Sequence, residues 1–454
     1  MEGVIVTLFI AGYILIALER PVRINKTAIA LLMGVLCWTL FMLSEPSSTL
    51  LHSDHYQHTI GSLQQSLKNF GALTAREVHT EYVATSLGHH LNEIAQILFF
   101  LMGAMTIVEL IDAHDGFRFI TNRIKTQDPK TLLWIICGIT FFLSAVLDNL
   151  TTAIVMVSLI RKIITDKEMR LFFAGMIIIA ANAGGAWSPI GDVTTTMLWI
   201  GGQVSPVAII KSTFLPSLVC VLVPLAYLSF TLKGSLGLRK ENKNSSYPIT
   251  RSNLVLFLGL GVLIAVPVFK TFTHLPPYLG MMLGLGIIWV VLELVHPLAD
   301  ETGKQPFTAA QALARIDMPS VLFFLGILLA VGALQSMAVL ENFAAYLQET
   351  IGDDRVIITL MGILSSVVDN VPLVAASMGM YSLEQYPMDH MIWEYLAYCT
   401  GTGGSLLIIG SAAGVATMGI EKIDFIWYFK RISLLAAMGY LAGALVYLLI
   451  RPLF

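Results

Sequence analysis

Residues 144–149 are Ser144-Ala-Val-Leu-Asp148-Asn149, and residues 365–370 are Ser365-Ser-Val-Val-Asp369-Asn370. Each pair of Asp and Asn interrupts a long apolar segment, 131–160 in the first case and 356–380 in the second. An ionised carboxylate is unfavourable in apolar surroundings unless it has partners. Two such pairs at corresponding positions therefore indicate a repeated element with a function, and this repeat organises the interpretation of the whole chain.

The composition around these motifs is typical of a membrane protein. Of 454 residues, 56% are hydrophobic and 13% are charged, whereas soluble proteins carry about 25% charged residues. The apolar segments are distributed along the whole chain, which allows on the order of ten spans of about 20 residues each. This excludes an ordinary cytosolic enzyme, and the net charge of −3 offers no basic surface for nucleic acid. We expect an all-α polytopic membrane protein that needs no cofactor.

Charge in the loops predicts how the spans are arranged. The expected spans are 4–18, 27–43, 94–111, 171–200, 212–232, 253–270, 277–296, 319–340, 392–420 and 432–450. Loops rich in Lys and Arg flank 131–160 on both sides, so the positive-inside rule returns this segment to the side from which it starts. The flanks of 356–380 are mostly acidic. We therefore predict two re-entrant hairpins, entering from opposite sides, and place both chain termini outside the cytoplasm.

The two halves of the chain repeat in order. Leu98-Phe-Phe-Leu101 recurs as Leu322-Phe-Phe-Leu325, and Gly184-Gly185 recurs as Gly403-Gly404, so that counterparts lie 219 to 224 residues apart. In the expected topology the counterparts run in opposite directions. This predicts an inverted five-plus-five repeat, the plan of many secondary transporters. The first repeat covers 1–232, with an outer His-rich segment at 44–93; a cytoplasmic linker covers 233–252, and the second repeat covers 253–454.

Two of the expected spans contain residues that break helices. Residues 182–196 (Asn-Ala-Gly-Gly-Ala-Trp-Ser-Pro-Ile-Gly-Asp-Val-Thr-Thr-Thr) and residues 401–414 concentrate Gly and hydroxyl side chains. Both stretches are typical of broken transmembrane helices, whose free carbonyls and helix ends coordinate ions. The alternative is a glycine-rich face for helix packing. Pro189 and Asp192 disfavour that alternative in the first half, and it competes more closely in the second.

Three acids lie deep in the apolar segments, namely Asp148, Asp369 and Asp192, and the repeat counterpart of Asp192 is Ser411. A charged carboxylate at the bilayer centre costs on the order of 2.5–3.5 kcal/mol. Low-dielectric surroundings favour the protonated form, so such a group can hold either a proton or a cation. Hard cations such as sodium prefer oxygen ligands. The remaining oxygens are expected from Asn149, Thr151, Thr152, Thr194, Thr195, Asn370 and Ser411. The alternative is that each hairpin aspartate caps a helix at a turn exposed to water.

Further titratable residues lie near the expected ends of spans. Glu93 stands at the outer mouth of the span 94–111, where position alone fits either an interface or a site. Glu109, Glu293 and Glu394 are expected at interfaces. Six of the ten histidines lie between residues 52 and 90. Histidine titrates near neutral pH, which makes His89 and His90 candidates for pH sensing; for most of the histidines, a solvated loop followed by an interfacial helix is the alternative.

These motifs resemble those of the NhaD-type sodium/proton antiporters, within the ion transporter superfamily. The matching stretches are 89–109, 147–153, 182–196, 368–372 and 401–419. The resemblance implies exchange of cytoplasmic Na⁺ or Li⁺ for external protons in a bacterial inner membrane, with roles for Asp148, Asp192, Asp369 and Glu93. It also implies a homodimer with scaffold and transport parts.

Other classes remain as alternatives. An anion carrier of the same superfamily, for arsenite or a di- or tricarboxylate, is expected to have neutral or cationic groups in place of the deep acids. An intramembrane aspartyl protease would use two buried acids, but Pro189 replaces the first glycine of the GxGD motif that Gly191 and Asp192 complete. A channel is harder to exclude. The sequence favours a sodium (or lithium)/proton antiporter rather than an enzyme, with the bilayer, Na⁺, Li⁺ and H⁺ as partners.

Overall fold

The structure is a computed structural model of the chain. It describes residues 2–17, 23–51, 56–57, 60–61, 74–117, 119, 126, 128–231, 249–295 and 308–451. The regular elements within these ranges are all helices. They form two units: unit 1 comprises Met1–Leu98, Asp317–Asp354 and Val371–Tyr386, and unit 2 comprises Phe99–Ile316, Arg355–Asn370 and Pro387–Phe454. Most of the predicted linker, at 233–248, and the histidines at 52, 55 and 58 lie outside the described residues.

Seven of the described helices are long and apolar enough to cross a membrane. They are α3 (Lys26–Leu43), α6 (Ala75–Ala113), α12 (Pro206–Thr231), α13 (Ile249–Thr273), α14 (Pro277–Val295), α16 (Met318–Ser336) and α23 (Ser433–Ile450). Large apolar side chains such as Leu32, Phe230 and Leu294 are exposed on them, as expected for surfaces that face lipid. The prediction of an all-α polytopic membrane protein is confirmed. The other three expected spans correspond to α1 (Glu2–Ala17) and to two interrupted helices.

Unit 1 is built around α3, which packs against α1 and α16. A Cβ on Gly34 or on Gly326 would clash with the backbone of the opposite helix, so α3 and α16 touch there directly. The Trp38 indole nitrogen also donates a hydrogen bond to the Leu329 carbonyl at 2.8 Å. Small residues at such crossings let membrane helices approach closely. The unit also contains α4 (Ser48–Leu51), α17 (Val339–Ile351) and most of α19 (Asn370–Met380).

Two helix boundaries differ from the prediction. α6 begins at Ala75, well before the predicted start at residue 94, because Thr74 and Glu77 form a reciprocal capping box. The segment just before residue 94 is therefore a continuous part of the long helix. In the other case, α16 ends at Ser336 rather than near residue 340, since Ala338 adopts a left-handed conformation with φ 59°. A new helix, α17, follows that turn.

Unit 2 contains the interrupted segments. The first hairpin consists of α8 (Pro129–Ser144) and α9 (Asn149–Ile163), and the second of α18 (Asp354–Leu364) with the start of α19. The first broken helix consists of α10 (Lys167–Gly185) and α11 (Val193–Ile200), and the second of α20 (Met391–Gly403) and α21 (Ala412–Glu421). All four interruptions lie where the sequence predicts them. The sides from which the hairpins enter and the inverted orientation of the halves stay predictions.

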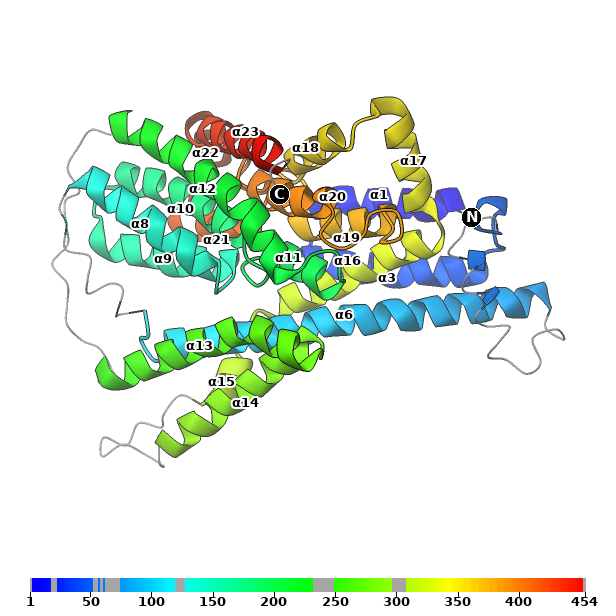
Figure 1. The fold of residues 1–454 in the computed structure, drawn as a ribbon, viewed down its shortest axis with the longest axis horizontal. Helices are drawn as coiled ribbons and strands as arrows, with labels where there is room; N and C mark the ends of the chain where they lie inside the picture. Colours follow the sequence, from blue (N-terminus) through cyan, green and yellow to red (C-terminus); the bar gives the residue numbers. More distant parts are fainter. Residues whose placement is uncertain are drawn as a thin grey trace. The chain divides into compact units, whose positions relative to one another are not determined.

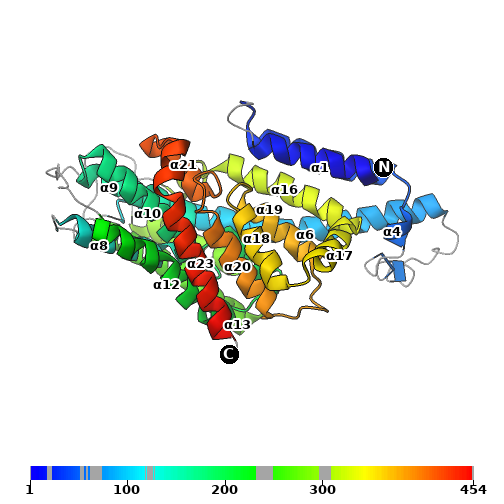
Figure 2. The same cartoon turned by 90° about the horizontal axis from the view of Figure 1, so that it is seen from above.

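The helices of unit 2 pack around α10, which contacts α8, α9, α12, α20 and α21. Figure 1 shows α8, α9 and α10 side by side, and α8 and α10 also pack against α12. α23 lies along α12, where Gly439 and Gly443 meet the Cys220 and Pro216 carbonyls without room for a Cβ, and Figure 2 shows α23 beside α12 and α20. The short helices α15 (Ala309–Leu313) and α22 (Phe425–Arg431) complete this unit.

Candidate ion-binding site

Four helices begin at the four interruptions of unit 2, and predicted site residues occupy each of these beginnings. Asp148 is the N-cap of α9, Asp192 of α11 and Ser411 of α21, while Asn370 is the first residue of α19. The N-terminal end of a helix carries a partial positive charge that stabilises a carboxylate. Polar side chains of the helix starts are buried inside the protein, including Asn149, Asp192, Asn370 and Ser411.

Asp148 is held by Thr151. Its two carboxylate oxygens accept hydrogen bonds from the Thr151 backbone nitrogen and hydroxyl, both at 2.7 Å. The capping alternative therefore describes the hydrogen bonds of Asp148, although the side chain is half-buried rather than at an open turn. A carboxylate has about four lone-pair sites, so capping leaves acceptor capacity for a cation.

Asp192 differs from Asp148 in its bonding. Within the described part of the chain, its side chain makes no capping hydrogen bond to α11. It accepts a hydrogen bond from the Thr194 hydroxyl at 2.9 Å, and the Thr195 hydroxyl donates to the Asp192 backbone carbonyl at 2.9 Å. The charges of Asp148 and Asp369 both act on the Asp192 carboxylate. The structure thus brings the three predicted acids into one electrostatic group around the buried Asp192.

The three acids do not form a compact metal cluster. Among the described residues, no three His, Cys, Asp or Glu side chains are close enough together to hold a metal ion. A cation at any one acid would therefore complete its shell with neutral oxygens. Thr152 is fully buried close to Asp148, and its hydroxyl has no hydrogen-bond partner among the described residues.

Asn182 connects the two halves of the site. Its side-chain nitrogen donates to the Ser405 and Ser411 hydroxyls, both at 2.9 Å. Its side-chain oxygen accepts a hydrogen bond of 3.1 Å from the Asn149 amide. One fully buried amide therefore joins the first hairpin, the first broken helix and both ends of the segment between α20 and α21. The sequence places Asn182 in a helix-breaking stretch but does not assign it to the site.

Equivalent contacts recur in both halves. The Ser144 hydroxyl donates to the Ala181 carbonyl at 2.6 Å, and the Ser365 hydroxyl donates to the Thr400 carbonyl at 2.9 Å. The glycines behave alike: a Cβ on Gly184 would meet the Phe141 carbonyl, and a Cβ on Gly403 would meet the Gly362 carbonyl. Each hairpin is thus attached to its broken helix by a serine hydroxyl and a close glycine contact.

Asn370 differs from Asn149 in its partners. Its amide nitrogen donates to the Gly410 carbonyl at 3.1 Å and to the Thr400 carbonyl at 3.2 Å, in the amide orientation that pairs donors with acceptors. It also contacts the Ser365 hydroxyl. Asn370 therefore fastens the second hairpin to the second broken helix within the same half. Asp369 before it is half-buried.

Glu93, His89 and His90 belong to unit 1 and form a cluster there. Glu93 lies 3.3 Å from His89 Nε2 and 3.6 Å from His90 Nδ1. His89 and Glu93 are exposed, whereas His90 is buried and its Nε2 lies 3.1 Å from the Ser336 hydroxyl. The predicted pH-sensing residues therefore contact one another and also contact Glu93.

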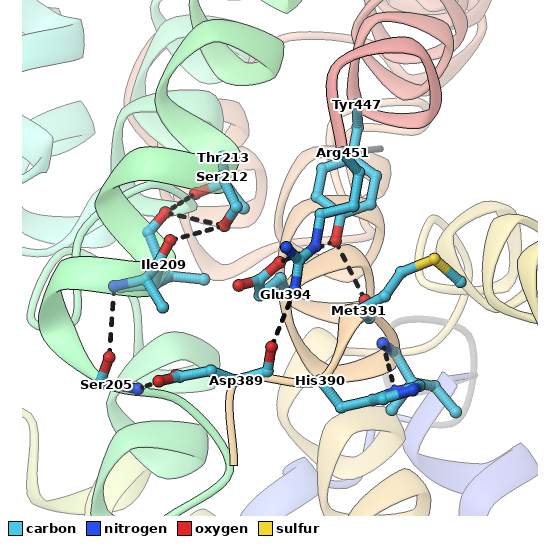
Figure 3. A network of polar contacts seen from close by, with 12 residues as sticks. Ser205, Ile209, Ser212, Thr213, Asp389, His390, Met391, Glu394, Tyr447 and Arg451 are labelled. Atoms are coloured by element: carbon cyan, nitrogen blue, oxygen red, sulfur yellow. Dashed lines mark hydrogen bonds and ion pairs between the residues drawn. The ribbon is translucent and has the colours of Figure 1, made fainter. Parts of the chain in front are cut away.

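Glu394, which was expected at an interface, is buried within the protein. Glu394 is 2% exposed and pairs with Arg451 Nε at 2.9 Å and with the Tyr447 hydroxyl at 3.0 Å. Figure 3 shows this network, in which Arg451 also donates to the Asp389 carbonyl at 3.0 Å and Asp389 accepts from the Ser205 nitrogen. The sequence near this helix end does not indicate that Glu394 is buried, because its partner Arg451 is distant in sequence. By contrast, Glu293 is exposed as expected.

Comparisons with known proteins show the family to which the chain belongs. The family described as "Citrate transporter" matches residues 13–401. "Sodium/proton antiporter 1" from Arabidopsis thaliana is 46% identical over 98% of this chain and 72% of its own length. "Sodium/proton antiporter 2" from the same plant is 44% identical over 98% of both chains. "Na(+)/H(+) antiporter NhaD" from Alkalimonas amylolytica is 30% identical over 98% of this chain and 90% of its own. By these matches the chain belongs to the citrate transporter family and, within it, to the NhaD-type sodium/proton antiporters.

Proposed function

We propose that the protein is a secondary-active antiporter that exports cytoplasmic Na⁺ or Li⁺ in exchange for external protons. The observation that carries the proposal is the bonding of Asp192. This buried carboxylate is not used for helix capping within the described residues, it faces the Thr194 hydroxyl, and it lies within the electrostatic reach of Asp148 and Asp369. A buried acid in such surroundings binds either a proton or a cation, and either one neutralises the group.

Competition for these carboxylates makes the exchange obligatory. A proton on Asp192 removes the negative charge that holds the cation, and a bound Na⁺ disfavours protonation. The neutral oxygens proposed to complete the shell are those of Asn149, Thr151, Thr152, Thr194, Thr195, Asn370 and Ser411. Thr151 orients Asp148 through two hydrogen bonds, and Asn182 holds Ser411 in place. Because the two ligands share one set of acids, no separate coupling device is needed.

A carboxylate carrier is the second candidate, favoured by the description of the matching family as citrate transporter. Helix N-termini suit anions when their N–H groups are free. Here, however, the starts of α9 and α21 are capped by Asp148 and Ser411. Three acids around these helix starts would also repel an anionic substrate. The acids therefore support a cation as the transported ion.

Reconstituted protein distinguishes the two candidates. In proteoliposomes with an imposed pH gradient, the antiporter proposal expects Na⁺ or Li⁺ to dissipate the gradient, and labelled citrate to remain outside. Citrate uptake without Na⁺-dependent proton movement would contradict the proposal. A flux that fails to saturate and continues without an opposing proton gradient would indicate a channel.

The cluster of His89, His90 and Glu93 is proposed to sense pH. Protonated histidines would pair with Glu93, and His90 would also change its contact with Ser336 on α16. The titratable groups around His90 in these contacts are His89 and Glu93 on α6 itself, and Ser336 and Trp38 contact it from α16 and α3. Substitution His90→Gln should shift the pH profile of exchange, whereas His114→Gln, after the end of the same helix, should leave it in place.

The location and assembly are part of the same proposal. A bacterial inner membrane with both termini outside the cytoplasm follows from the loop charges and from the resemblance, and a homodimer follows from the superfamily. Accessibility of a cysteine introduced at Glu2 to a membrane-impermeant reagent in whole cells tests the orientation. Labelling only in everted vesicles would contradict it.

A further inference from the structure

The hydroxyl of Tyr428 binds a backbone carbonyl in the second broken helix, between α20 and α21. Tyr428 lies on α22 and is fully buried, and its hydroxyl donates to the Ser405 carbonyl at 2.8 Å. Ser405 follows the end of α20 at Gly403, where helical carbonyls lose their partners. The side chain of the same Ser405 accepts the hydrogen bond from Asn182. Tyr428 therefore binds the backbone carbonyl of Ser405, and Asn182 binds its side-chain hydroxyl.

The first broken helix has a counterpart of this contact, between α10 and α11. Ala186 lies 219 residues before Ser405, and its carbonyl accepts a hydrogen bond from the Thr213 hydroxyl at 3.2 Å. Thr213 is also fully buried, but it donates at 2.6 Å to the Ile209 carbonyl within its own helix (Figure 3). A hydroxyl has one hydrogen to donate. The Thr213 contact with Ala186 is therefore the weaker of the two.

Resting on the proposed antiport, we propose that Tyr428 is a positioning residue for the ion site, with Thr213 as its weaker counterpart. By donating to the Ser405 carbonyl, Tyr428 fixes the orientation of that peptide. The Ser405 hydroxyl then lies where Asn182 can reach it, and Asn182 in turn reaches Ser411 at the start of α21. Without the phenol hydroxyl, the freed carbonyl and the serine can rotate, which alters the oxygens that surround the cation.

The test uses Tyr428→Phe, which keeps the buried ring and removes only the hydroxyl. The matched control is Tyr398→Phe, because Tyr398 is likewise fully buried and its hydroxyl donates to a backbone carbonyl, that of Tyr440, at 2.8 Å. Exchange is measured in proteoliposomes for Na⁺ and Li⁺ separately, per amount of folded protein from size-exclusion chromatography. A hydrogen bond of ordinary strength corresponds to a change of about 2- to 13-fold.

The expected result for Tyr428→Phe is a rise in the Na⁺ KM within that range and a changed ratio of Li⁺ to Na⁺ KM, with the maximal rate little altered. Thr213→Val should shift the ratio less, and Tyr398→Phe should not shift it. An unchanged KM and ratio in Tyr428→Phe, or equal changes in Tyr398→Phe, would overturn the inference. If Tyr428→Phe does not fold, Thr213→Val carries the test, and an unchanged ratio there overturns it. A wild-type protein without Na⁺/H⁺ exchange would instead contradict the proposed function.

Discussion

The side-chain amide of Asn182 donates a hydrogen bond of 2.9 Å to the Ser411 hydroxyl, although the two residues lie in opposite halves of the chain. Asn182 lies in the last turn of α10, the first part of one broken helix, and Ser411 is the N-cap of α21, the second part of the other. The same amide also binds Ser405 and Asn149. A displacement of either interruption must therefore move or break contacts of the other. In the proposed mechanism, this linkage would let a cation bound in one half affect the ligands in both.

Asn182→Leu should disable exchange. The substitution retains a side chain of similar volume but removes the donor to the Ser405 and Ser411 hydroxyls and the acceptor of the Asn149 amide, while Ser411 keeps the hydrogen bond from the Gly414 nitrogen. Each buried polar group left unpaired costs about 1–3 kcal/mol. We expect a fall in kcat/KM of at least about tenfold in proteoliposomes. Asn342→Leu is the control, because the Asn342 amide donates to the Ala338 carbonyl within unit 1. An equal loss of exchange in both variants would show that the contacts of Asn182 have no specific role.

Asp148 and Asp128 both cap helices, so substitutions at the two sites separate the capping role of an aspartate from a role of its charge in ion exchange. Asp128 is the N-cap of α8 and accepts hydrogen bonds from the Thr131 nitrogen at 2.8 Å and hydroxyl at 2.6 Å, as Asp148 does from Thr151. Asparagine caps a helix about as well as aspartate. Asp148→Asn should therefore preserve the thermal midpoint but reduce exchange by at least about tenfold, whereas Asp128→Asn should preserve both.

The control residue Asp128 remains ionised when exchange is measured near neutral pH. The hydrogen bonds from Thr131 lower the pKa of Asp128 below its ordinary value. A lowered pKa adds stability above the unfolded pKa, and this is lost only when the pH falls through the folded pKa. Protonation of Asp128 therefore does not contribute to a pH profile measured near neutrality.

If the Asp148→Asn variant exchanged ions at the wild-type rate, Asp148 would serve only as a helix cap, and its charge would have no role in exchange.

Gly403→Ala should separate the second hairpin from its broken helix. A Cβ at residue 403 would clash with the Gly362 carbonyl, so α18 must move away from α20. Overpacking of this kind costs about 1–3 kcal/mol. At Gly138 on α8, a Cβ would meet no atom within 4 Å, so Gly138→Ala should be neutral or stabilise by up to about 1 kcal/mol. Thermal unfolding in detergent measures both, and a stable Gly403→Ala variant would contradict the described contact.

The ion pair of Glu394 and Arg451 should show strong coupling in a double-mutant cycle. Removal of one member of a buried pair leaves an uncompensated charge and destabilises by about 3–5 kcal/mol. Arg451→Met and Glu394→Gln should each lower the thermal midpoint, with a larger effect for Arg451→Met because Glu394 is the more buried partner. The double variant should recover much of the loss. Additive single effects would show that the pair in Figure 3 is not formed.

The interruptions were predictable because helix breakers and acids are costly in apolar segments. The Asp-Asn pairs at 148–149 and 369–370 mark where α9 and α19 begin, and the glycines at 184 and 403 mark where α10 and α20 end. These signals are local, since each depends on a few neighbouring residues. The family resemblance rests on the same stretches.

The contacts across the halves were not predictable from the same signals. Asn182 and Ser405 stand inside the recognised stretches, but nothing local indicates that they bind each other over 223 residues. The burial of Glu394 is not predictable for the same reason, because it depends on an arginine that is distant in sequence. The start of α6 is not predictable from hydropathy, because an apolar span ends where polar residues begin, whereas a capped helix continues beyond its hydrophobic part.

In the proposed mechanism the proton and the cation compete for the same carboxylates, and the pH dependence of the Na⁺ KM reports this competition. In proteoliposomes assayed at a series of pH values, binding of either ion to the same carboxylates predicts that the KM rises as pH falls, by up to about tenfold per pH unit, while the maximal rate at saturating Na⁺ changes little. Asp192→Asn should abolish this dependence together with the exchange. A Na⁺ KM that stays constant across the series, with only the maximal rate falling at low pH, would show that the proton and the cation occupy separate sites and would contradict the account.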